Sequence, residues 1–185
     1  LSCAIWRRNN GSLKIHTSEP YSIIDNKTCL YFILGAKSSW LPCRDVEDFL
    51  GGIGRGFKFL QQVSVTDPFA PASPLMMNLG VLSGSEIMTG LRVYFHGHSP
   101  LKRTHDGRPI PMWSAGSDKF GTKLRATGTD ELILSGRCDR PSILVLRRSA
   151  NGPEVELADG AALVGLTTSA KILMLADRYE DAHFA

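Results

Sequence analysis

Short apolar segments bounded by turn-forming residues run through most of the chain, and Gly90–His98 is the clearest of them. Its side chains alternate, with Leu91, Val93 and Phe95 on one side and Arg92, Tyr94 and His96 on the other. A period of two is typical of an antiparallel strand that buries one face. We therefore expect Leu91, Val93 and Phe95 to be buried, and Arg92 and Tyr94 to face solvent or a partner.

Other segments share this short, apolar, turn-bounded character, and each is expected to form a strand. They are Tyr21–Ile24, Cys29–Leu34, Phe57–Val65, Leu132–Ser135, Ile143–Leu146, Ala162–Leu166 and Ile172–Ala176. Asp25–Lys27 has the composition of a hairpin turn between the first two. Roughly eight strands without a β-α-β rhythm favour an all-β sandwich or barrel over a dinucleotide-binding sheet.

One helix is expected, over Cys43–Leu50, because acidic residues fill its first turn and Gly51–Gly52 would end it. The glycine-rich run Gly51–Gly56 fits neither the dinucleotide-binding nor the Walker spacing, so a turn is expected there instead of a phosphate loop. Pro68, Pro71 and Pro74 predict a rigid loop after it.

Length and charge set wider limits. The length of 185 residues suits one domain, 1–185, with 1–12 as an arm. The formal net charge of +3 gives no sign of the clustered basic face that is typical of nucleic-acid binding. The longest apolar run, Cys29–Ala36, is too short for a membrane span. We expect no membrane partner.

Metal and nucleophile chemistry find little support. Cys3, Cys29, Cys43 and Cys138 form no C-x-x-C pair, and dispersed cysteines favour buried thiols in a reducing compartment. His96, His98 and His105 are the one set of residues that could hold a metal, as in cupin-like enzymes. Lys102 and Arg103 place positive charge beside them, which disfavours a dication. The sequence therefore assigns no catalytic, cofactor-binding or metal-binding residue and no cofactor.

A resemblance to a known family rests on four stretches of the sequence, namely Pro74–Asn78, Thr89–His98, Lys102–Gly107 and Ala170–Phe184. Together they resemble the middle and the last strand of picornavirus-like coat proteins, most closely the small coat proteins of plant secoviruses. The resemblance implies an antiparallel eight-stranded jelly roll with one or two short helices.

The same resemblance implies a structural, non-enzymatic capsid subunit, cleaved from a polyprotein. It would assemble with sister subunits into an icosahedral shell around single-stranded RNA, in the virion and the host cytoplasm. Loop residues such as Phe69, Leu75 and Trp113 would then be buried by neighbouring subunits. Two alternatives remain open: a cupin-like metal enzyme that uses His96, His98 and His105, and a β-sandwich binding or adhesion domain.

Overall fold

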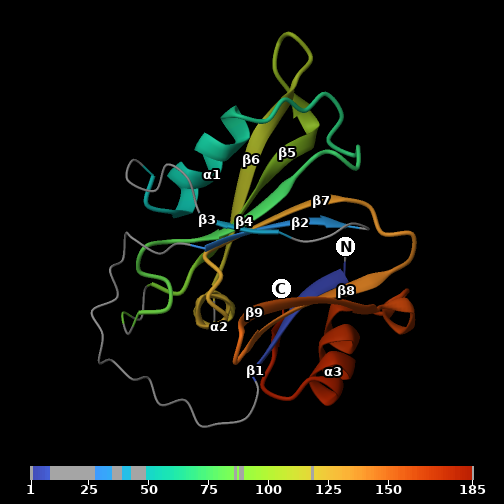
Figure 1. Ribbon diagram of the computed structural model, residues 1–185. Helices are drawn as coiled ribbons and strands as arrows, with labels where there is room; N and C mark the ends of the chain where they lie inside the picture. Colours follow the sequence, from blue (N-terminus) through green and yellow to red (C-terminus); the bar gives the residue numbers. More distant parts are fainter. Residues whose placement is uncertain are drawn as a thin grey trace.

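The computed structural model describes the strands at 2–8, 28–34 and 39–42, and residues 49–85, 87, 90–117 and 119–184 (Figure 1). For 2–8, 28–33 and 39–42 it describes the backbone alone. The described elements, in chain order, are β1 (Ser2–Arg8), β2 (Thr28–Leu34), β3 (Ser39–Pro42), α1 (Gly52–Gln61), β4 (Leu75–Leu79), β5 (Val93–Arg103), β6 (Pro109–Gly116), α2 (Phe120–Ala126), β7 (Glu131–Gly136), β8 (Ser142–Ser149), β9 (Gly152–Asp159), a 3₁₀ turn (Ala161–Leu163), α3 (Thr168–Arg178) and β10 (His183–Phe184).

Two sheets of mixed direction form the framework. The larger sheet has the strand order β3-β2-β7-β4-β5-β6, and the smaller has the order β10-β1-β8-β9. The pairs β2–β7 and β1–β8 run parallel, whereas the other neighbouring pairs run antiparallel. Neighbouring strands in a jelly roll run antiparallel, whereas two pairs here run parallel, and the described residues also form three α-helices. The all-β jelly-roll expectation is therefore wrong, and the chain is a small mixed α/β fold.

The main core lies between the two sheets and includes one side of α2. Its buried members are Met77, Leu79, Val93, Phe120, Leu124, Leu132, Leu134, Leu144 and Leu146. A second cluster joins the other face of β8 to α3, through Ile143, Val145, Ala158, Leu163 and Leu175. In Figure 1, α1 covers the outer face of the larger sheet and α3 covers the outer face of the smaller one. A strand buried on both faces needs apolar residues at every position, which explains the unbroken run Ile143–Leu146.

The strand predictions at Cys29–Leu34, Leu132–Ser135 and Ile143–Leu146 are confirmed, because these residues lie within β2, β7 and β8. The segment predicted at Leu91–His96 begins at Val93 in β5. The predicted strand Tyr21–Ile24 and the turn Asp25–Lys27 lie outside the described residues. The division into a single domain 1–185 with an arm at 1–12 stays a prediction.

The glycine-rich turn and the strand Phe57–Val65 were wrong predictions, since α1 spans Gly52–Gln61. Its buried residues, Gly52, Arg55, Gly56 and Leu60, follow the spacing of one helix face. Glycine on that face lets α1 approach the sheet closely, because a Cβ at Gly56 would overlap the His96 ring. Of the predicted helix Cys43–Leu50, residues 43–48 lie outside the described residues, and Phe49 and Leu50 precede α1.

The predicted strand Ile172–Ala176 was also wrong, because it lies inside α3. Thr167 caps this helix: its hydroxyl accepts a hydrogen bond from the amide of Ala170 at 3.3 Å. The predicted strand Ala162–Leu166 contains a 3₁₀ turn instead. Short apolar runs suit a strand or a helix, and a capping threonine before the run favours the helix.

The burial predicted from the alternation is confirmed at Val93, and the exposure at Arg92. Phe95 was expected to be buried but is half-buried, although it packs against the main core. Leu91 and Tyr94 are half-buried. His96 was expected on the polar face but is 1% exposed, because α1 covers that face.

Candidate functional site

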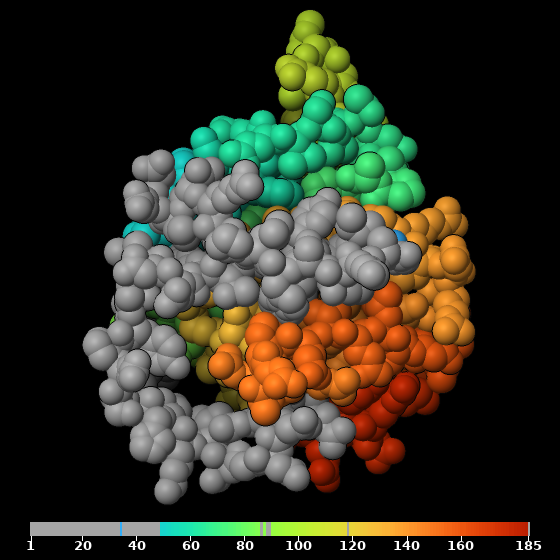
Figure 2. Space-filling model, in the orientation of Figure 1, coloured from blue at the N-terminus to red at the C-terminus, as the bar shows by residue number. Residues whose placement is uncertain are grey.

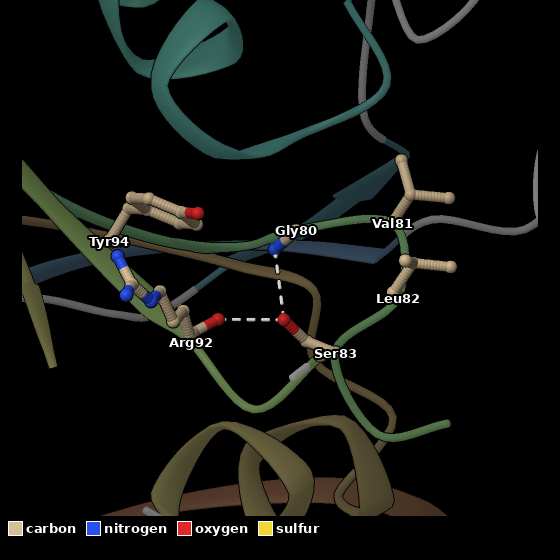
Figure 3. Close-up of a pocket in the computed structure, with 7 residues that line it drawn as sticks. Gly80, Val81, Leu82, Ser83, Arg92 and Tyr94 are labelled. Atoms are coloured by element: carbon tan, nitrogen blue, oxygen red, sulfur yellow. Dashed lines mark hydrogen bonds between the residues drawn. The ribbon is translucent and has the colours of Figure 1, made fainter. Parts of the chain in front are cut away.

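A pocket of about 220 Å³ opens between the loop that follows β4 and the beginning of β5. Its lining residues are Gly80, Val81, Leu82, Ser83, Gly90, Arg92 and Tyr94. Figure 3 shows Arg92 and Tyr94 on one side of this space and the loop of Val81 and Leu82 on the other. We call it the Arg92 pocket. Loops held between strands of a sheet are common positions for ligand sites.

Ser83 joins the two sides of the Arg92 pocket (Figure 3). Its hydroxyl accepts a hydrogen bond from the Gly80 amide at 3.1 Å and donates one to the Arg92 carbonyl oxygen at 2.6 Å. The Ser83 amide donates to the Gly80 carbonyl oxygen at 3.1 Å, which closes a tight turn. The pocket loop is therefore fixed to the beginning of β5 before any ligand is present.

Glycines in and near the pocket loop allow backbone atoms and the Tyr94 ring to approach closely. A Cβ at Gly90 would lie 2.5 Å from the carbonyl oxygen of Leu82, so no larger residue fits there without a shift. A Cβ at Gly80 would lie 3.6 Å from the Tyr94 ring, and one at Gly52 would lie 3.4 Å from it. Tyr94 is therefore held between the pocket loop and the first residue of α1.

Arg92 supplies the chemistry of the pocket, because it is the one charged residue among those that line it. Its side chain is exposed, and within the described part of the chain no carboxylate pairs with it. A guanidinium presents several N–H donors in a planar fork that matches carboxylate and phosphate oxygens. The pocket is therefore suited to an anionic group that lies against a glycine-rich backbone.

The three histidines of the cupin-like alternative do not meet in one site. His96 is buried beneath α1, His98 is half-buried farther along β5, and His105 is exposed in the turn between β5 and β6. That turn projects away from the body of the molecule (Figure 2). Burial lowers the pKa of both His96 and His98 below the usual histidine value. Across the described residues, no three His, Cys, Asp or Glu side chains form a group that could hold a metal ion.

The cysteines add no second site. Cys138 carries a free thiol and lines a shallow pocket of about 250 Å³ together with Asp139, Arg140 and Ser142. Cys3 and Cys29 belong to strands described by backbone alone, and Cys43 lies outside the described residues. No helix in the part of the chain described here is long and apolar enough to cross a membrane.

The sequence analysis assigned no role to Arg92 or to the Gly80–Ser83 loop. The available signal was the cluster of glycine and serine around Gly80, Ser83, Gly84 and Gly90, just before an alternating strand. Such a cluster predicts a loop, but it does not show that Arg92 lies across from it. That relation depends on the pairing of β4 with β5, in which Leu79 lies opposite Val93.

Comparison with known proteins decides the family. Residues 36–185 match the family model described as aldehyde ferredoxin oxidoreductase, N-terminal domain. The chain belongs to this family. It is 31% identical over 137 residues to a tungsten-containing aldehyde ferredoxin oxidoreductase of Pyrococcus horikoshii, and 30% identical over 137 residues to one of Pyrococcus abyssi. Each match covers 73% of this chain and 21% of the relative, so the chain spans about a fifth of the length of these relatives.

A solved structure supports the fold independently. The active-site complex BamBC of benzoyl-coenzyme A reductase, in complex with 1,5-dienoyl-CoA, superposes with a TM-score of 0.68. The match covers 84% of this chain and 23% of the other chain at 22% sequence identity. The two chains therefore share the fold of mixed sheets and helices described above.

These findings overturn the coat-protein interpretation. The family is one of cellular oxidoreductases, so the expectations of a capsid subunit, a polyprotein product, sister coat subunits, an RNA partner and a virion location were wrong. The expectation of a non-enzymatic protein was wrong as well, and neither the cupin-like nor the adhesion alternative is supported. Of the loop residues expected at a capsid interface, Phe69 and Trp113 are exposed, whereas Leu75 packs on the chain's own core.

Proposed function

We propose that the chain acts as the N-terminal domain of a tungsten-containing oxidoreductase, and that the Arg92 pocket binds an anionic group of the tungsten centre. Family membership supports the first part, because the relatives are named as tungsten-containing enzymes. The observation that carries the second part is the exposed Arg92 side chain, which lines a pocket with glycine in its walls and has no carboxylate partner among the described residues.

Direct ligation of tungsten by this chain does not fit the described residues. They offer no group of three or more His, Cys, Asp or Glu side chains that could coordinate a metal ion. Contact through hydrogen bonds and charge does fit, because a guanidinium binds oxyanions and acidic substituents strongly when little water separates them. In this proposal Arg92 neutralises and orients the anionic group, and Tyr94 closes one wall beside it.

The reaction follows from the names of the relatives. They give an aldehyde as substrate and ferredoxin as electron partner. We carry this reaction class over to the protein in which the present chain is the N-terminal domain. Within it, the task of the chain is to hold the redox centre in a fixed orientation, which is the contribution that a protein makes to cofactor chemistry.

Tungsten content tests the proposal. The protein is purified from its source after growth with tungstate, and its tungsten is measured by elemental mass spectrometry. The wild-type protein should carry tungsten. The Arg92→Met variant should contain at least about tenfold less tungsten than wild type, as expected when a charge-assisted contact is removed. Arg103→Met is the matched control, because Arg103 is exposed on the projecting β5–β6 turn. A wild-type protein without tungsten, or equal content in the two variants, would refute the proposal.

A further inference from the structure

A second arginine, Arg125, reaches the back of the Arg92 pocket from α2. Its Nη2 atom donates a hydrogen bond to the carbonyl oxygen of Gly80 at 3.0 Å. Its Nη1 atom lies 2.9 Å from Oδ1 of Asp130, and the side chains of Arg125 and Asp130 are 31% and 11% exposed. Arg125 does not line the pocket. Its effect on the pocket therefore passes through the loop.

The Gly80 carbonyl is the point at which the pocket loop is fixed. It accepts a hydrogen bond from the Ser83 amide as well as from Arg125, while the Gly80 amide donates to the Ser83 hydroxyl. The same hydroxyl donates to the Arg92 carbonyl oxygen. A continuous set of hydrogen bonds therefore runs from Arg125 through Gly80 and Ser83 to the backbone of Arg92.

Gly84 and Asp130 both help to accommodate Arg125 where it contacts Gly80. Gly84 has a φ of +84°, and a Cβ there would lie 2.8 Å from Cδ of Arg125, so the aliphatic part of Arg125 passes directly over the glycine. Asp130 holds the same region twice: its carboxylate pairs with Arg125, and its carbonyl oxygen accepts from the Leu79 amide at 3.0 Å. The end of β4 and the loop after it are thus both tied to the residue that precedes β7.

We propose that Arg125 is a positioning residue for the Arg92 pocket, which it serves by holding the Gly80–Ser83 turn in the shape that places Arg92 toward the bound group. This rests on the function proposed above, since the pocket must bind the redox centre for its shape to matter. A lysine at position 125 keeps one donor and the positive charge near Asp130. A methionine keeps the aliphatic packing on Gly84 and removes every donor.

The contact is tested by amide hydrogen exchange in the protein as its source makes it, without reference to any ligand. In Arg125→Met, the amides of Gly80 and Ser83 should exchange at least about tenfold faster, because a hydrogen bond from a charged donor is lost. Arg178→Met is the matched control, because Arg178 donates to the Asp159 carbonyl oxygen at 3.3 Å, far from the pocket loop in sequence. Unchanged exchange at Gly80 and Ser83 in Arg125→Met would overturn the proposal.

Tungsten content separates positioning from a purely structural role. We expect Arg125→Met to carry several-fold less tungsten than wild type at an unchanged unfolding temperature, and Arg125→Lys to restore most of it. If Arg92→Met loses tungsten and Arg125→Met does not, the positioning role is wrong and the proposed function stands. If the wild-type protein has no tungsten, the proposed function fails, and the positioning role with it, while the exchange experiment still decides whether Arg125 holds the turn.

Discussion

Arg55 of α1 forms a two-pronged contact with Glu131 of β7, with Nε to Oε1 at 2.6 Å and Nη2 to Oε2 at 3.1 Å. The two side chains are only 10% and 2% exposed. The preceding residue, Asp130, pairs in turn with Arg125 of α2. Two consecutive carboxylates at the beginning of β7 therefore anchor two helices, one of which contacts the pocket loop.

The first prediction concerns the Arg55–Glu131 pair. Glu131→Gln should destabilise the protein by about 3–5 kcal/mol, because it removes the carboxylate charge that faces the buried Arg55 guanidinium. The double variant Arg55→Met with Glu131→Leu should lose much less, since both charges are removed together. Urea unfolding at neutral pH measures both. A single variant that loses no more stability than the double variant would show that the pair is not what fastens α1.

The second prediction concerns two glycines of α1. Gly56→Ala should cost about 1–3 kcal/mol, because its methyl group would overlap the His96 ring and force α1 off the sheet. Gly54 is exposed on the same helix, and a Cβ there would meet only Phe49 at 3.8 Å. Gly54→Ala should therefore raise stability by about 0.5–1 kcal/mol through helix propensity alone. Equal effects at the two positions in thermal unfolding would argue against close contact between α1 and β5.

The third prediction concerns acid. Burial lowers the pKa of His96 below the 6.5 of an unfolded histidine. The unfolded chain then binds more protons, so stability should be complete above about pH 6.5 and fall as pH drops through that value toward the lower folded pKa. His98 shifts in the same direction and adds to the effect. Unfolding temperatures should fall less steeply toward pH 5 in His96→Gln than in wild type; parallel curves would contradict a neutral, buried His96.

The fourth prediction concerns the core between the sheets. Leu132 of β7 is 0% exposed, so Leu132→Ala should cost about 2–5 kcal/mol. Leu101 lies near the end of β5 and is 90% exposed, and Leu101→Ala should change stability by less than about 0.5 kcal/mol. Chemical unfolding of both variants checks the expectation. Similar losses at both positions would mean that the two sheets do not pack through Leu132.

The alternating pattern of β5 predicted burial on one face of the strand only. The alternation at Val93 and Phe95 predicted the face that meets the core, because only that face packs on the other sheet. The same alternation placed His96 on the polar face with Arg92 and Tyr94, since nothing local shows that α1 will cover it. Side-chain burial on a sheet's outer face depends on a distant helix, and period-two reasoning does not include that helix.

The two misassigned helices have a common physical cause. In α1, glycines at positions 52 and 56 were interpreted as a turn, yet they form the helix face that approaches the sheet. In α3, the apolar run Ile172–Ala176 has the length of a strand, and the cap at Thr167 was not recognised in the sequence. The glycines of α1 and the apolar run of α3 can each be assigned to a helix only when the surface that the segment packs against is known.

The candidate site could not be predicted from the sequence, for a different reason. Arg92 was correctly predicted to be exposed, but its role depends on the loop Gly80–Ser83, which Ser83 ties to it and Arg125 braces from α2. These contacts join residues up to 45 positions apart. Resemblance in short strand-like stretches led toward coat proteins because such stretches occur in many folds.

We propose that the tungsten centre lies against the Arg92 pocket. Crystals of the protein as its source makes it, measured at the tungsten absorption edge, would locate the metal directly by its anomalous signal. We expect one tungsten centre whose bound groups contact the Arg92 guanidinium and the Gly80–Ser83 loop. A tungsten centre that lies elsewhere and leaves Arg92 in solvent, or a protein without any tungsten peak, would contradict it.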